Sequence, residues 1–145
     1  MHRRQLARLR GLGVRMTTLN PKLAQRRFVH LLETFVVSEQ RAELLQSPRG
    51  VHTTLERALM PELSVVPAPK DVVAWLCANE PSAWIARFDP RHAAALELFA
   101  SSVQNEWLSS WPGIYLSNDG KRLLCVSVDY ERSLCDASPR ATPYR

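Results

Sequence analysis

The side chains best suited to chemistry are the cations near the start of the chain. The first 32 residues contain eight Lys or Arg and no Asp or Glu, since Glu33 is the first acid. Sixteen of the nineteen cations in the whole chain are Arg, whose planar guanidinium pairs with phosphate through two parallel hydrogen bonds. We therefore predict a polyanion-binding segment formed by Arg3, Arg4, Arg8, Arg10 and Arg15.

The positive charge is confined to this end of the chain. The net charge is +5, and the first 32 residues contribute +8, so the remaining residues sum to −3. A basic end on a mildly acidic body is typical of a segment that meets a polyanion or an anionic surface.

The same stretch has two further interpretations. It is Arg-rich and acid-free, with Leu6, Leu9 and Leu12 on one helical face, which is also typical of a mitochondrial presequence. Alternatively, it is sequence upstream of a start at Met16, or solvated disorder. Arginines interrupt every apolar run near the start, so we expect no secretory signal, and no apolar run reaches the roughly 18 residues of a membrane-spanning helix.

Residues for metal or nucleophilic chemistry are sparse. His30 and Glu33 stand three residues apart on an expected helix, but no second pair at ligand spacing accompanies them. The chain contains no nucleophile elbow, zinc-protease or phosphate-loop motif, and only five glycines. We predict that the protein is not an enzyme and has no metal, no cofactor and no small-molecule substrate.

The cysteines indicate a reducing compartment. Cys77, Cys125 and Cys135 are odd in number and form no C-x-x-C pair, so we expect free thiols. The corresponding localisation is the mitochondrial matrix or the bacterial cytoplasm. A Cys125–Cys135 disulfide is the alternative for an exported protein.

Four tryptophans complete the candidate residues. Trp75 and Trp107 have apolar neighbours at helical spacing, which predicts core positions. Trp84 and Trp111 stand close to prolines, and we predict that they contribute to a protein interface, where Trp is enriched.

The elements that would position these residues predict an α+β fold that is predominantly helical. A chain of 145 residues, 46% hydrophobic and 23% charged, is expected to form one globular domain. We expect about five helices with a C-terminal β-hairpin packed on them, the hairpin turning at Asp119-Gly120. The alternative is that the apolar face of the hairpin joins another strand, for which the stretch near Val65 is the candidate. The expected helices cover residues 20–47, 53–60, 71–80, 81–88 and 89–111.

The domain organisation follows from these elements. We expect a basic N-terminal arm over residues 1–19, a globular domain over 20–132 with a proline linker near 64–70, and an extended tail over 133–145.

Together these features favour a non-enzymatic accessory protein. Its domain would bind protein partners, and its basic arm would bind RNA or another acidic surface of a larger assembly, such as an organellar ribonucleoprotein. The alternative is a small bacterial inhibitor or immunity-type protein that neutralises a single protein partner.

Overall fold

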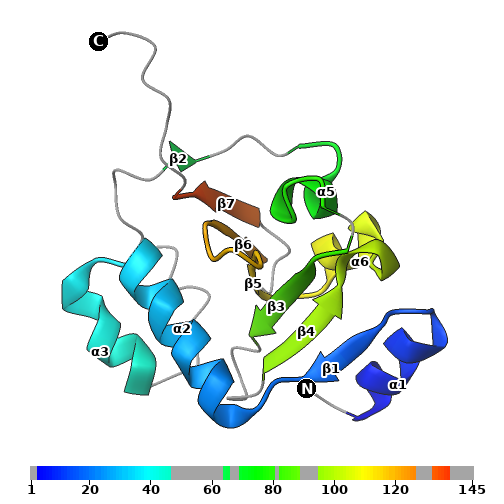
Figure 1. Ribbon diagram of the computed structural model, residues 1–145, viewed down its shortest axis with the longest axis horizontal. Helices are drawn as coiled ribbons and strands as arrows, with labels where there is room; N and C mark the ends of the chain where they lie inside the picture. The colour runs from blue at the N-terminus through cyan, green and yellow to red at the C-terminus, as the bar shows by residue number, and fades with distance from the viewer. Residues whose placement is uncertain are drawn as a thin grey trace, which may run out of the picture.

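The centre of the protein is an antiparallel sheet of seven strands in the order β1-β4-β3-β5-β6-β7-β2. The computed structural model describes residues 3–46, 64–65, 69–80, 82–88, 95–126 and 132–137. Figure 1 shows β1 beside β4 at one end of the sheet and β2 beside β7 at the other. The strands are β1 (Met16–Thr18), β2 (Ser64–Val65), β3 (Trp84–Phe88), β4 (Ala95–Phe99), β5 (Gly113–Leu116), β6 (Arg122–Val126) and β7 (Arg132–Asp136).

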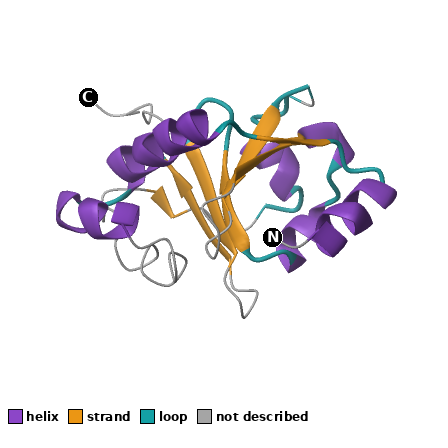
Figure 2. Ribbon diagram, turned by 90° about the horizontal axis from the view of Figure 1, so that it is seen from below, coloured by secondary structure: helices purple, strands orange, loops and turns teal. Residues whose placement is uncertain are grey.

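Helices lie on both faces of this sheet and give a three-layer arrangement (Figure 2). One face carries α2 (Pro21–Phe35) and α3 (Ser38–Gln46). The other carries α1 (Arg3–Gly11), α5 (Val72–Leu76) and α6 (Asn105–Ser110), with a short 3₁₀ turn at Ala100–Ser102.

Each face has its own apolar core. Successive residues of a strand point to opposite faces, so Ile114 packs beneath α2 while Tyr115 packs beneath the other helices. All four residues of β5 are buried. The central strands are therefore buried on both sides.

The expectation of a predominantly helical fold is wrong, because two expected helices are strands. Residues 81–88 contain β3, and the described part of 89–111 contains β4, the three-residue 3₁₀ turn and the six-residue α6. A strand buried on both faces has no polar residue at every second position, and its apolar run resembles that of a buried helix. Asp89, the first residue of that expected helix, lies outside the described residues.

The helix expected over 20–47 begins as predicted. The Asn20 side chain accepts a hydrogen bond from Lys22 N–H (2.9 Å), and Pro21 opens α2.

That helix divides in two, however, because the chain becomes extended at Val36 (φ −109°, ψ 139°). The Arg41 guanidinium on α3 donates to the carbonyl oxygens of Leu32, Glu33 and Val36, at 3.0 to 3.1 Å. The final carbonyls of α2 thus find a side-chain partner, which stabilises the break.

The C-terminal hairpin is confirmed. β5 and β6 pair antiparallel, with Gly120 at the turn in a left-handed conformation (φ +73°), and β2 near Val65 joins the sheet through β7. The helix expected over 71–80 is present as the shorter α5, whose N-cap Asp71 accepts from Ala74 N–H at 2.8 Å. Residues 53–60 lie outside the described residues.

The segments expected at the two ends both contribute strands. β7 begins at Arg132, the last residue of the expected domain, and continues into the expected tail as far as Asp136, and residues from 138 onward are outside the described part. At the other end, residues 1–19 supply α1 and β1, with Leu9, Val14 and Leu19 buried.

Candidate binding interface

The end of α1 fixes the basic segment to the sheet. Gly13 has φ +94°, its N–H donates to Arg10 O (3.0 Å), and Val14 N–H donates to Leu9 O (3.1 Å). This pattern is a Schellman motif, which needs a left-handed residue and joins the two flanking apolar side chains. Leu9 and Val14 are 8% and 4% exposed in the same core cluster, so the chain turns back onto the sheet at this point.

β1 then forms the outer strand beside β4. Leu19 N–H donates to Ala95 O and Phe99 N–H donates to Arg15 O, both at 2.9 Å. Since alternate residues of an antiparallel strand face their partner, the N–H and C=O groups of Met16 and Thr18 point away from β4. No strand of the described residues pairs with that side of β1.

Five exposed cations lie on the elements that flank this open strand in the chain. We call them the basic edge: two lie on α1, one directly precedes β1, and two lie in the first turns of α2. They are Arg8, Arg10, Arg15, Lys22 and Arg26. None of the five forms an ion pair within the described part of the chain.

A neighbouring cation shows the contrast. Arg27 lies 3.8 Å from the Glu97 carboxylate of β4, and both side chains are partly buried. Its charge is compensated within the protein, whereas the charges of the basic edge face solvent.

Arg15 is the most firmly positioned cation of the basic edge. Its N–H donates to Ser102 Oγ (2.9 Å), and its guanidinium carbon lies 4.7 Å from the centroid of the Phe99 ring. The Phe99 ring in turn lies 5.1 Å from that of Trp84. The structure thus brings two aromatic rings to a cation that is far from them in the sequence.

The predicted polyanion-binding residues are placed as follows. Arg8, Arg10 and Arg15 carry exposed side chains on the basic edge. Arg3 and Arg4 belong to the backbone of α1, and their side chains lie outside the described part. Sequence reasoning did not select Lys22 or Arg26 for the site, although both belong to the acid-free stretch that signalled it.

The two predicted interface tryptophans have different surroundings. Trp84 is partly buried on β3 and packs on Phe99. Trp111 is 7% exposed, with the Arg87 guanidinium 3.8 Å from its ring centroid and Tyr115 packed edge-on. The placement of Trp111 favours a core role over a docking role.

His30, which the sequence analysis considered with Glu33 as a metal ligand, packs against another part of the protein. The His30 ring lies over the hairpin turn, where a Cβ added to Gly120 would be 2.5 Å from its Nε2. Among the described residues, no three His, Cys, Asp or Glu side chains gather in a way that could hold a metal ion.

Cys77, Cys125 and Cys135 form no disulfide, as expected, and all three are buried. In the β6–β7 register Cys125 faces Ser133 and Cys135 faces Leu123, so the two thiols are diagonal neighbours. Diagonal residues are roughly 7–8 Å apart, too far for a disulfide without backbone movement. Burial raises the pKa of Cys135, which further lowers its reactivity.

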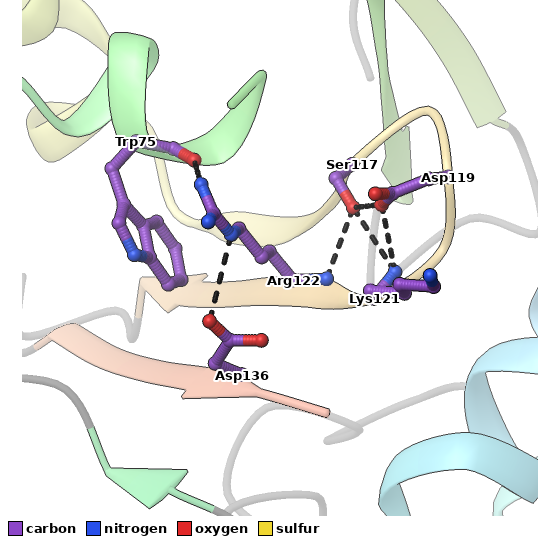
Figure 3. A network of polar contacts seen from close by, with 6 residues as sticks. All are labelled: Trp75, Ser117, Asp119, Lys121, Arg122 and Asp136. Carbon is purple, nitrogen blue, oxygen red and sulfur yellow. Dashed lines mark hydrogen bonds and ion pairs between the residues drawn. The ribbon is translucent and has the colours of Figure 1, made fainter. Parts of the chain in front are cut away.

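A polar network supports the hairpin turn and α5 (Figure 3). Ser117 Oγ donates to Asp119 Oδ1 (2.6 Å), which also accepts from Lys121 N–H (3.0 Å). Arg122 donates to the carbonyl oxygen of Trp75 at the end of α5 and lies 3.6 Å from Asp136. These contacts link the turn, the helix and β7, and we assign them to the architecture.

The pKa of Asp119 reflects this network. Partial burial acts to raise the pKa, but the hydrogen bonds from Ser117 and Lys121 N–H, with the charges of Lys121 and Arg122, outweigh it. The pKa therefore lies below its usual value.

No helix in the described ranges has the length and apolar character needed to cross a membrane. Comparisons with protein-family models, with curated proteins and with solved structures gave no match.

Proposed function

We propose that this chain is a non-enzymatic accessory protein that contacts RNA of a larger assembly through its basic edge. The observation that carries the proposal is the group of five exposed, uncompensated cations around β1. Four of them are Arg, whose guanidinium presents the paired donors that phosphate accepts.

The surrounding backbone adds to the positive potential. The first turn of the 15-residue α2 contains no acidic residue, so its N-terminal partial charge adds to those of Lys22 and Arg26. The outward N–H groups of Met16 and Thr18 lie between these residues and Arg15 and offer further donors to phosphate oxygens.

We further propose that the chain binds a protein partner through a different surface. A shallow groove of about 150 Å³ between α1 and α6 is lined by Leu9, Leu12, Trp107, Trp111 and Arg8. Leu12 is 51% exposed there, and a volume of this size accommodates one apolar side chain of a partner.

Binding of a 12-nucleotide oligouridylate at several salt concentrations tests the RNA contact. Each neutralised phosphate contributes about −0.7 to the slope of log K against log salt for a single strand. We expect a slope of about −2 to −3.5 for the intact chain. For Arg10→Ala the slope should be less steep, that is, closer to zero by about 0.7.

Lys70→Ala is the matched control, because Lys70 is also exposed but precedes α5, which packs on β6. It should leave the slope unchanged. Absence of salt-dependent binding, or an equal loss in the Lys70 variant, would contradict the proposal and favour the inhibitor-type alternative.

A further inference from the structure

Arg15 differs from the other cations of the basic edge because an aromatic ring supports it. The guanidinium carbon lies 4.7 Å from the Phe99 centroid, and Trp84 packs on Phe99 from the neighbouring strand, with the two rings tilted by 59°. The side chain of Arg15 is nevertheless exposed. The guanidinium of Arg15 thus contacts the Phe99 ring and also remains accessible to solvent.

The backbone of Arg15 is also held in place. Its N–H donates to Ser102 Oγ at 2.9 Å, and that hydroxyl donates to Phe99 O at 2.7 Å. Its carbonyl accepts from Phe99 N–H at 2.9 Å. Contacts at both backbone and side chain reduce the conformational entropy that Arg15 would lose when it binds a ligand.

A supported, planar and exposed guanidinium is suited to stacking as well as to ion pairing. Bases of single-stranded RNA stack on aromatic rings and on guanidinium planes, and the contact tolerates any base because every base has a π face. Bases of a duplex are stacked on one another and do not offer this face.

We propose that Arg15, supported by Phe99 and Trp84, stacks on a nucleobase of single-stranded RNA while the other cations contact its phosphates. This inference rests on the proposed function and defines the form of RNA that the basic edge binds. Arg15 then determines the preference for single-stranded RNA. Affinity for any RNA comes from the phosphate contacts of the other four cations, Arg8, Arg10, Lys22 and Arg26.

The experiment compares two probes with the same phosphates. The affinity of the full chain is measured for a 12-nucleotide oligouridylate and for an abasic ribose-phosphate oligomer of equal length. We expect the oligouridylate to bind at least about fivefold more tightly, which is the lower range for stacking of one base. A 12-base-pair RNA duplex should show no such gain.

Three variants separate stacking from charge. Arg15→Lys retains the charge without the planar group, and Phe99→Leu retains an apolar side chain without the ring. Both should reduce the ratio of the two affinities to below about twofold. Arg10→Lys is the matched control and should leave the ratio unchanged, because no aromatic contact supports Arg10 within the described residues.

The outcomes are distinct. Equal affinity of the intact chain for both oligomers overturns the stacking inference but leaves the phosphate contact intact. A ratio that survives Arg15→Lys also overturns it, and this exposed variant does not depend on the packing of Phe99. Failure to bind either oligomer contradicts the proposed function itself.

Discussion

Arg87 and Arg15 both lie over aromatic rings, but only Arg15 faces solvent. Arg87 is 2% exposed and 3.8 Å from the Trp111 centroid, whereas Arg15 is exposed and 4.7 Å from that of Phe99. A cation–π contact contributes about 0.5–1 kcal/mol at an exposed site and about 2 kcal/mol or more when desolvated. The same contact therefore serves stability in one place and leaves a charge accessible to a ligand in the other.

Arg87 connects several elements on the face of the sheet that carries α6. It extends from β3, and its Nη2 donates to Pro112 O (2.5 Å) while its Nε donates to Tyr115 Oη (3.3 Å). The Tyr115 hydroxyl donates to Trp111 O at 2.5 Å. The end of α6 is thereby joined to β3 and β5.

We expect the largest loss of stability when the buried contacts of Arg87 are removed. Arg87→Ala removes the donors to Pro112 and Tyr115 and leaves a cavity beside Trp111, so we expect a loss of about 3–5 kcal/mol in the free energy of unfolding. Chemical denaturation measures it. Arg87→Lys should be intermediate, and a loss below about 1 kcal/mol in Arg87→Ala would show that the guanidinium does not hold these elements together.

Gly113→Ala tests how tightly the same arginine is enclosed. A Cβ at Gly113 would lie 2.9 Å from the Nε and Nη2 atoms of Arg87, closer than normal packing permits. Because Arg87 is buried and has little room to move, we expect a loss of about 1–3 kcal/mol. Gly11→Ala is the control, since a Cβ at Gly11 would meet no atom within 4 Å and should not destabilise the fold.

In its burial, Arg122 is intermediate between Arg87 and Arg15. It lies 5.4 Å from the Trp75 centroid, and its side chain is 25% exposed. Arg122→Ala removes the hydrogen bond to Trp75 O and the ion pair with Asp136, so we expect a loss of about 1–2 kcal/mol in thermal or chemical unfolding. An effect as large as that of Arg87→Ala would contradict this ranking by burial.

Asp119 is an anion at the hairpin turn, and we expect it to contribute less to the free energy of unfolding than Arg122 does. Its lowered pKa means that the folded protein binds the proton more weakly than the unfolded chain does. Its contribution is complete above the unfolded pKa of about 3.9 and is lost as the pH falls through the lower folded pKa. The stability difference between the native chain and Asp119→Asn should therefore be constant from pH 5.5 to 7 and shrink below about pH 4. A difference that grows in acid would contradict the direction of the shift.

The smallest effect on stability is expected at Arg15. Arg15→Ala removes an exposed cation–π contact while the backbone hydrogen bonds remain, so the free energy of unfolding should fall by only about 0.5–1 kcal/mol. The same denaturation measurement checks this value. A loss comparable to that of Arg122→Ala would mean that Arg15 belongs to the architecture, as Arg87 does.

The parts of the fold that sequence could predict are those with local signals. Asn20 and Pro21 mark the start of α2, and Asp119-Gly120 marks the hairpin turn, because caps and turns depend on a few adjacent residues. β3 and β4 carry no such signal. β3 is buried on both faces by helices far away in the chain, so alternation could not reveal it. β4 is a short strand in which the buried Ala95, Leu96 and Leu98 accompany the partly buried Glu97 and Phe99.

The candidate site divides in the same way. The absence of acids made Arg8, Arg10 and Arg15 candidates from the sequence alone, and the structure leaves their side chains exposed. The support of Arg15 by Phe99 could not be predicted, because the sequence pattern predicts a helix where β4 carries Phe99. Trp111 lies beside a proline, yet the sequence contains no sign that Arg87 would bury its ring.

The pairing of β1 with β4 has a consequence for synthesis. Met16 pairs with Leu98, which is 82 residues later in the chain. At about 5–20 residues per second, a ribosome would add Leu98 roughly 4–16 seconds after Met16, so β1 emerges long before its partner exists. Such a distant pairing also folds slowly, because a large loop must close first. The strand that Arg15 directly precedes is thus made well before β4 and reaches its place in the sheet late.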